Sequence, residues 1–156
     1  MSTLDFLNLF CGLGSGLMAG LFFVFSICVM RALRSLPPAC GIAAMQSINI
    51  VIINPIFLFV FLGTAGLCVA AIVLVFVRGD LADLWGTIAG GALYLIGVLF
   101  VTMRFNAPLN NGLARVSGQS GDAAQFWSAY LSQWTVWNHV RTVAGLAAAL
   151  SFALTR

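Results

Sequence analysis

Four long apolar segments, separated by short stretches that carry most of the charges, dominate this sequence. They run from Phe6 to Met30, from about Ile48 to Val77, from Leu84 to Met103, and from Val136 to Leu154. Each is close to or longer than the roughly 20 residues that a helix needs to cross a membrane, whereas membrane β-strands span about 10 residues and alternate in polarity. We therefore expect an all-α integral membrane protein, with residues 1–156 forming one domain built as a four-helix bundle.

The composition agrees with this fold class. Only 7% of the residues are charged, and the chain contains neither Glu nor Lys. Because a soluble domain normally has about 25% charged residues, that class is excluded. Asp5 stands where a signal peptide would have basic residues, and the first apolar segment exceeds the usual length of about 7 to 15 residues. We expect this segment to remain in the mature protein.

The arginines indicate the orientation, because positive residues collect in cytoplasmic loops. Arg31 and Arg34 lie in the first loop, and Arg104 and Arg115 lie in the third. These loops are therefore expected in the cytoplasm, with the N-terminus and the C-terminus outside. The expected location is the bacterial inner (plasma) membrane. The net charge of +3 is too small and too dispersed to indicate a nucleic-acid partner.

The chain offers few metal ligands. It has one histidine, and Cys11, Cys28, Cys40 and Cys68 stand singly, without a CxxC pair. Isolated cysteines in apolar segments usually act as small hydrophobic side chains. A di-iron or di-haem bundle needs more His and Glu ligands than this chain provides, so we expect no metal and no other cofactor.

Small residues indicate how the helices pack. Gly12, Gly16 and Gly20 recur every four residues in the first apolar segment, and Gly86 and Gly90 do so in the third. Faces of small residues let helix backbones approach closely inside a membrane. Packing within the chain is the favoured explanation. The alternative is a GxxxG homodimer, so a homo-oligomer remains open.

Asn, Arg and Trp side chains gather in three segments of this otherwise apolar chain. These are Gln46, Asn49 and Asn54, then residues 104–111, and then residues 134–141. Counting about 20 residues per crossing from the outer ends places all three near the inner interface. Trp134, Asn138 and Arg141 are spaced i, i+4, i+7, which puts them on one helix face. The pattern predicts a pocket just inside the cytoplasmic leaflet.

An aromatic belt is the simpler explanation for part of this cluster. Trp134 and Trp137 could lie at the membrane interface, with Arg141 extending to the lipid phosphates. The asparagines favour a pocket, because Asn gains little from headgroups. Several of them beside an arginine indicate mutual hydrogen bonds or a bound polar ligand.

Two further positions have alternative explanations. Asn54-Pro55 is either a plain kink or a helix break that frees the carbonyl near Val51 for a side chain, water or ligand. His139 is the only imidazole and the obvious general base. It lies one residue away from the helix face that carries Asn138, so a position at the rim or the lipid interface is equally compatible with the pattern.

The polar motifs together resemble a known family. In order they are Gln46-x-x-Asn49-x-x-x-x-Asn54-Pro55, Asn106-x-Pro108-x-Asn110-Asn111 and Trp134-x-x-Trp137-Asn138-x-x-Arg141. This combination in a small four-helix membrane protein is similar to the anthrone-oxygenase-like family, in which bacterial membrane proteins of unknown function are grouped with fungal anthrone oxygenases. The resemblance extends from the second helix to the fourth. It implies an oxygenase that acts on an aromatic polyketide or phenolic substrate.

The local chemistry is compatible with that implication. An anthrone has an acidic benzylic proton, and its anion can react with O2 without metal or flavin if a protein holds the ring and stabilises the anionic oxygen. Trp134 and Trp137 are the candidate stacking surfaces, and Arg141 and Asn138 are the candidate catalytic donors. His139, or a water held by asparagines, is the candidate base. The other candidate substrate-binding residues are Asn49, Asn54, Arg104, Asn106, Asn110 and Asn111.

Two other function classes use the same residues. A non-catalytic membrane protein could bind a quinone, an isoprenoid or a lipid headgroup in this pocket. For an oxygenase and for a binding protein alike, the expected partners are membrane lipid and a hydrophobic or aromatic small molecule. A transporter is disfavoured, because four helices leave little room for alternating access and no acidic residue lies in mid-membrane.

Overall fold

The structure is a computed structural model that describes residues 2–78 and 81–155, and every regular element in these ranges is helical. In chain order the elements are α1 (Thr3–Val24), η1 (Phe25–Val29), α2 (Met30–Arg34), α3 (Pro38–Val51), α4 (Pro55–Arg78), α5 (Leu81–Tyr94), η2 (Leu95–Phe100), η3 (Thr102–Asn106), α6 (Ala107–Leu113) and α7 (Ala123–Leu154). The three η elements are π-helical. The predicted all-helical fold is confirmed for the described residues.

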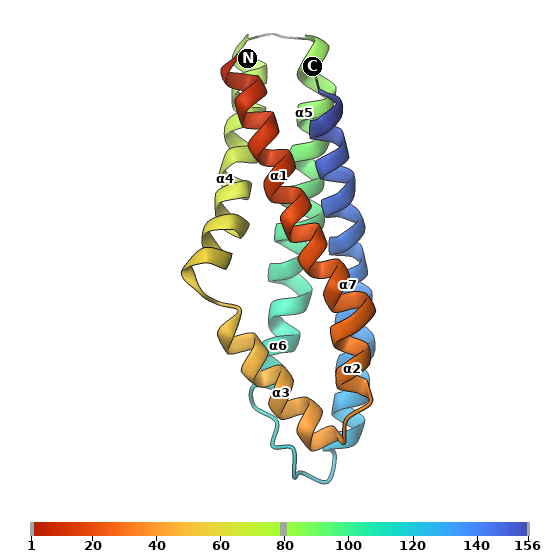
Figure 1. The fold of residues 1–156 in the computed structure, drawn as a ribbon. Coiled ribbons are helices and arrows are strands. Elements are labelled where there is room, and N and C mark those ends of the chain that lie inside the picture. Colours follow the sequence, from red (N-terminus) through yellow and green to blue (C-terminus); the bar gives the residue numbers. More distant parts are fainter. Residues whose placement is uncertain (1, 79–80, 156) are drawn as a thin grey trace.

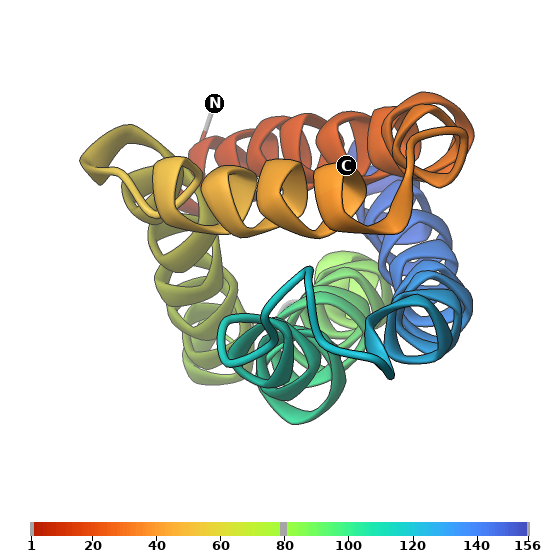
Figure 2. The ribbon, with the colours of Figure 1, turned by 90° about the horizontal axis from the view of Figure 1, so that it is seen from below.

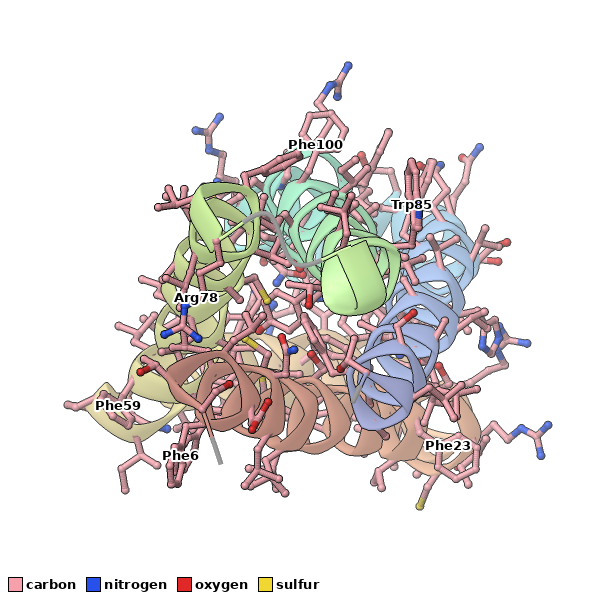
Figure 3. The ribbon with its side chains drawn as sticks, turned by 90° about the horizontal axis from the view of Figure 1, so that it is seen from above. Phe6, Phe23, Phe59, Arg78, Trp85 and Phe100 are labelled. Atoms are coloured by element: carbon pink, nitrogen blue, oxygen red, sulfur yellow. The ribbon has the colours of Figure 1, made fainter. Side chains whose placement is uncertain are left out.

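The long helices lie side by side around a common axis (Figure 1). α1 packs against α4 and α7, and α5 packs against the same two helices. α4 and α7 therefore lie on opposite sides of the axis, as the view from above shows (Figure 3). α3 runs across the lower end of the molecule, where it contacts α2, α6 and α7 (Figure 2). Both ends of the described chain lie at the upper end (Figure 1).

Local sequence signals determine where several helices begin. Ser2 caps α1 in a capping box, since its hydroxyl accepts from the backbone N–H of Asp5 and the Asp5 carboxylate accepts from the N–H of Ser2. Pro38 begins α3, where its missing N–H leaves no helix hydrogen bond unmade. The second apolar segment is divided at Asn54-Pro55 into α3 and α4. This break shapes the site described below.

The buried apolar side chains form two clusters, one above the other. The upper cluster joins α1, α4, α5, η2 and α7 and includes Cys11, Phe22, Phe61, Cys68, Tyr94 and Phe152. The lower cluster joins α2, α3, α6 and α7, with residues that include Met30, Ile42, Met45, Leu113, Trp127, Tyr130 and Trp134. Between them lies a layer of polar side chains that contains Asn106, Asn138 and Arg141.

Three helical stretches are long and apolar enough to cross a membrane: Thr3–Arg34, Pro55–Arg78 and Leu84–Leu113. Large aromatic side chains on them point outward (Figure 3), as expected for a surface in contact with lipid; the labelled ones are Phe6, Phe23, Phe59, Trp85 and Phe100. The fourth expected span, 136–154, lies within α7 and is not among these stretches of the described chain. Its polar residues lower its hydropathy, so a fourth crossing stays a prediction.

Glycines permit close helix contacts at the expected position Gly90 and at Gly97, which the sequence analysis did not name. A Cβ added at Gly97 would lie 2.3 Å from the Ala144 side chain, and one at Gly90 would lie 2.9 Å from Phe152, so α7 packs on η2 and α5 through these glycines. At Gly16 and Gly20 an added Cβ would meet nothing within 4 Å. The expected packing within the chain therefore does not apply to these two positions, and a homodimer through them stays a prediction.

Candidate functional site

A cavity of about 340 Å³ lies between the two apolar clusters. Its walls come from α1, η1, α3, the α3–α4 connection, α4, η3, α6 and α7, and they are mostly apolar. Six lining residues carry polar groups: Asn49, Thr102, Asn106, Asn110, Trp134 and Arg141. The three polar segments of the sequence therefore do converge, and five of the residues predicted to form a site line one cavity. Thr102 is the one polar lining residue among these six that the sequence analysis did not predict.

Arg141 is the only charged residue among those that line the cavity in the described part of the chain, and its side chain is 5% exposed. Its Nη2 donates to Asn138 Oδ1 at 2.6 Å, and its Nη1 donates to Thr102 Oγ1 at 3.3 Å. The guanidinium lies over two aromatic rings, 4.2 Å from the centroid of Phe22 and 5.1 Å from that of Trp134. These contacts hold a planar cation against the cavity.

This buried cation has no carboxylate partner in the part of the chain that the structure describes. Its Nε is buried and makes no hydrogen bond. Asp5 lies in the first turn of α1, at the upper end. Asp122 directly precedes α7 and lies 19 positions before Arg141, which corresponds to about 28 Å of helix. Burying an unpaired charge costs several kcal/mol, so such a group usually has a counter-ion. The cavity is therefore suited to an anionic occupant.

Asn138 holds Arg141 in place from the side that faces away from the cavity. Its side chain is fully buried, and its Nδ2 donates to the carbonyl of Phe22 at 2.6 Å and to Ser26 Oγ at 2.7 Å. Its Oδ1 accepts from Arg141, as described above. Asn138 does not line the cavity, so its place is that of a positioning residue.

The contribution of α1 and η1 is absent from the sequence prediction. Phe22 supplies a ring and a carbonyl to the Arg141 network, and Ser26 supplies a hydroxyl. Ser26 lies in the π-helical turn η1, a kind of distortion that is frequent at functional sites. A hydroxyl inside a long apolar run was the only signal for it. Thr102 had a clearer one, because Thr102, Asn106 and Asn110 are spaced by four and share one helix face.

Asn110 organises the lower wall. Its Oδ1 accepts from Trp134 Nε1 at 2.9 Å and from the Tyr130 hydroxyl at 2.8 Å. Because an indole N–H can only donate, the atom that faces Trp134 must be the oxygen of the amide. Asn106 Nδ2 donates to the Trp134 carbonyl at 3.2 Å. Trp134 is thereby fixed through both its ring and its backbone, with the ring forming part of the cavity wall.

Three buried polar atoms of cavity-lining residues lack a hydrogen-bond partner among the described residues: Asn49 Nδ2, Asn106 Oδ1 and Arg141 Nε. Buried polar groups in proteins almost always have partners, because an unsatisfied one costs about 1 to 3 kcal/mol. Two of these atoms are donors and one is an acceptor. A bound molecule or water that both accepts and donates hydrogen bonds would satisfy them.

Asn54 forms hydrogen bonds with backbone groups at the break between α3 and α4. Its Nδ2 donates to the carbonyl of Val51 at 3.1 Å, and its Oδ1 accepts from the N–H groups of Ile56 at 3.1 Å and Phe57 at 3.0 Å. The carbonyl freed by Pro55 is thus taken by a side chain from the same break. Asn54 does not line the cavity.

The four remaining predicted residues lie outside the cavity. Trp137 stacks on Phe105 with ring centroids 3.5 Å apart, which fastens α7 to η3. Arg104 is exposed, with its guanidinium 5.4 Å from the Phe105 ring centroid. Asn111 is exposed, and His139 is exposed on the outer face of α7. Their proposed roles in binding and catalysis receive no geometric support.

A sequence model of the anthrone oxygenase family matches residues 57–151, which is more than half of the chain. The chain belongs to the anthrone oxygenase family. The match covers Asn106, Asn110, Trp134 and Arg141, and it begins after the residues that α1 and α3 contribute to the cavity. Comparisons with curated proteins and with solved structures find no match. In the described residues, no three His, Cys, Asp or Glu side chains gather as a metal site would require.

Proposed function

We propose that this member of the anthrone oxygenase family oxidises a planar, ionisable aromatic compound in the Arg141 cavity. The observation that carries the proposal is the buried guanidinium without a carboxylate partner among the described residues, which faces a mostly apolar space. A substrate that becomes an oxyanion during the reaction supplies the missing negative charge. Its apolar rings match the remaining walls.

The reaction for an anthrone balances with O2 as the only co-reactant. Loss of a proton from the ring CH2 gives an aromatic enolate, whose negative charge lies on the former carbonyl oxygen. The enolate reduces O2, the CH2 becomes a second carbonyl with one atom of O2, and the other atom leaves in water. Arg141 stabilises the charge that develops on the oxygen, because a preorganised donor in a water-poor site acts strongly on such charge.

The proton has no obvious acceptor among the protein groups. The described cavity-lining residues include no carboxylate, imidazole or thiol, and His139 faces outward. In the proposed mechanism the cation lowers the pKa of the substrate, so that the proton passes to solvent water before O2 reacts. Trp134 and Phe22 supply the aromatic faces on which the substrate rings stack.

For the membrane arrangement we propose a four-helix bundle in which α7 is the fourth crossing. Its polar residues Asn138, Arg141 and Thr142 are buried inside the molecule, so lipid does not meet them. Both ends of the described chain lie opposite the end with α2 and the connection between α6 and α7 (Figure 1), the segments to which Arg31 and Arg115 belong. We therefore keep the N-terminus and the C-terminus outside, with the cavity towards the cytoplasmic leaflet of a bacterial inner membrane.

Turnover of a defined anthrone tests the activity. Purified protein in detergent is given 1,8-dihydroxy-9-anthrone and ¹⁸O2, and the anthraquinone is analysed by mass spectrometry. We expect faster formation than in buffer, with one ¹⁸O per product. Arg141→Met should lower the rate about 10²-fold, the scale of a lost oxyanion donor. Arg104→Met is the matched control, because Arg104 is exposed and outside the cavity, and it should keep the rate of the native protein.

Binding without chemistry is the second candidate, and the lack of a protein base among the described lining residues favours it. In that case the cavity holds a quinone, an isoprenoid or a lipid headgroup. Wild-type protein that binds an anthrone but forms the quinone no faster than buffer, between about pH 6 and 9, would support this account. The oxygenase proposal would then be wrong for this substrate class.

A further inference from the structure

We propose that ligands reach the Arg141 cavity sideways from the bilayer, through a gap between the lower half of α4 and η3. The substrate would then be an amphiphile dissolved in the membrane, with an apolar body and one ionisable oxygen. This inference rests on the proposed ligand-binding role of the cavity and adds the route and the physical state of the ligand.

The gap follows from the break at Asn54-Pro55. α4 packs against α5 and η2 in its upper part, but no Cα atom of α4 lies within 8 Å of a Cα atom of η3 or α6. Its lower end bends away from α6, and the connection to α3 runs around the outside (Figure 1). The side of the molecule between residues 53–62 and η3 is therefore not sealed by helix packing, and we name it the side opening.

Four apolar residues at the side opening both line the cavity and face the surroundings. Ile53 is 66% exposed, Leu58 is 37% exposed, Leu62 is 52% exposed and Met103 is 63% exposed. A residue that lines a cavity and is also exposed lies where the cavity meets the exterior. Phe59, beside them on α4, is 79% exposed and points outward (Figure 3). The surface around the side opening is thus suited to acyl chains.

Packed side chains close several of the other directions. Below the cavity lie the lower-cluster residues Met45 and Trp134, and Phe61 lies at its upper limit. α1 packs against α4 and α7, and α7 packs against η2 and η3. α1 and α3 do not pack against each other, but the lining residues on that side, such as Phe25 and Ile52, are half-buried and not exposed. α7 lies opposite α4 (Figure 3), so a ligand that enters at the side opening meets Arg141 on the far wall. The ionisable oxygen of the ligand would enter the cavity first, and the apolar part of the ligand would enter after it.

The rates of ligand exchange test this route. Protein in phosphatidylcholine vesicles is mixed with 1,2-dihydroxyanthraquinone, a stable dye whose colour changes on ionisation, and its absorbance is followed by stopped flow. Leu58→Trp and Met103→Trp, on opposite sides of the opening, should slow association and dissociation together by about tenfold, with little change in Kd, since a narrowed passage affects both directions equally. Phe59→Trp is the control, because Phe59 does not line the cavity.

The outcomes separate the route from the site. Wild-type protein that does not bind the dye would overturn both the proposed cavity function and this inference. Binding with native exchange rates in both tryptophan variants would overturn the sideways route alone. Equal slowing by Phe59→Trp would also overturn it, because the effect would then belong to α4 in general.

Discussion

Arg141→Lys separates a forked guanidinium site from a cation that merely extends to the lipid interface. Lys keeps the positive charge and also reaches an interface, so a snorkelling role predicts a nearly silent change. In the structure, however, the guanidinium donates to Asn138 and Thr102 at once and lies over the Phe22 ring. A lysine ammonium is a point donor without a planar fork, so it cannot reproduce all of these contacts.

The size of the effect follows from what Lys loses. It can restore the short bond to Asn138 Oδ1, but then the bond to Thr102, at 3.3 Å, and the planar contact with the ring at 4.2 Å are lost. A charged hydrogen bond contributes about 1.5 to 3 kcal/mol, and a desolvated cation–π contact about 1 to 2 kcal/mol. Because the bond to Thr102 is long, we expect the free energy of unfolding to fall by about 2 kcal/mol, and Kd to rise because a planar donor is no longer held at the cavity.

Two measurements in the same detergent test this. Titration with 1,2-dihydroxyanthraquinone gives Kd, and thermal unfolding gives Tm, which should also fall. Arg104→Lys is the matched control, because this exposed arginine lies outside the cavity and should leave both values unchanged. Native Kd and native Tm in Arg141→Lys would refute the reasoning about the forked site.

Three further changes test other parts of the account. Gly97→Ala should lower the free energy of unfolding by about 1 to 3 kcal/mol, since its Cβ has no room, whereas Gly16→Ala should be nearly neutral; thermal unfolding compares them. His139→Gln should keep the anthrone oxidation rate, because this side chain faces outward, and a large loss would restore His139 as the base. With the native cysteines changed to Ala, Ser117→Cys should resist an impermeant thiol reagent in intact cells while Ser2→Cys reacts; the reverse labelling would invert the orientation.

Much of the architecture is accessible from the sequence, because apolar length and helical spacing are local properties. The face that carries Trp134, Asn138 and Arg141 follows from a spacing of 3.6 residues per turn, and the structure buries all three. The convergence with Asn106 and Asn110 follows from membrane depth, since about 20 residues cross the apolar layer. These arguments need no knowledge of which helices are neighbours.

The residues that sequence reasoning misplaced or missed depend on other information. Which helix faces α7 is a long-range property, so the carbonyl of Phe22 and the hydroxyl of Ser26 could not be assigned to Asn138. Asn54 was expected in the site, but an Asn at a helix break is well placed to bond its own backbone. Trp137 is turned away from the cavity by its rotation about α7 and stacks on Phe105 instead.

The central claim is that Arg141 stabilises an oxyanion inside an apolar cavity, and the ionisation of a bound dye measures this directly. Absorbance spectra of bound 1,2-dihydroxyanthraquinone, recorded against pH, give the pKa of the ligand in the cavity. An opposite charge in contact favours the ionised form of a ligand. The pKa of the dye bound to wild-type protein should therefore lie about 1 to 2 units below the pKa of the dye in solution. Arg141→Met should remove this shift. A neutral spectrum for the dye bound to wild-type protein, or an anionic one that persists in Arg141→Met, would contradict the account.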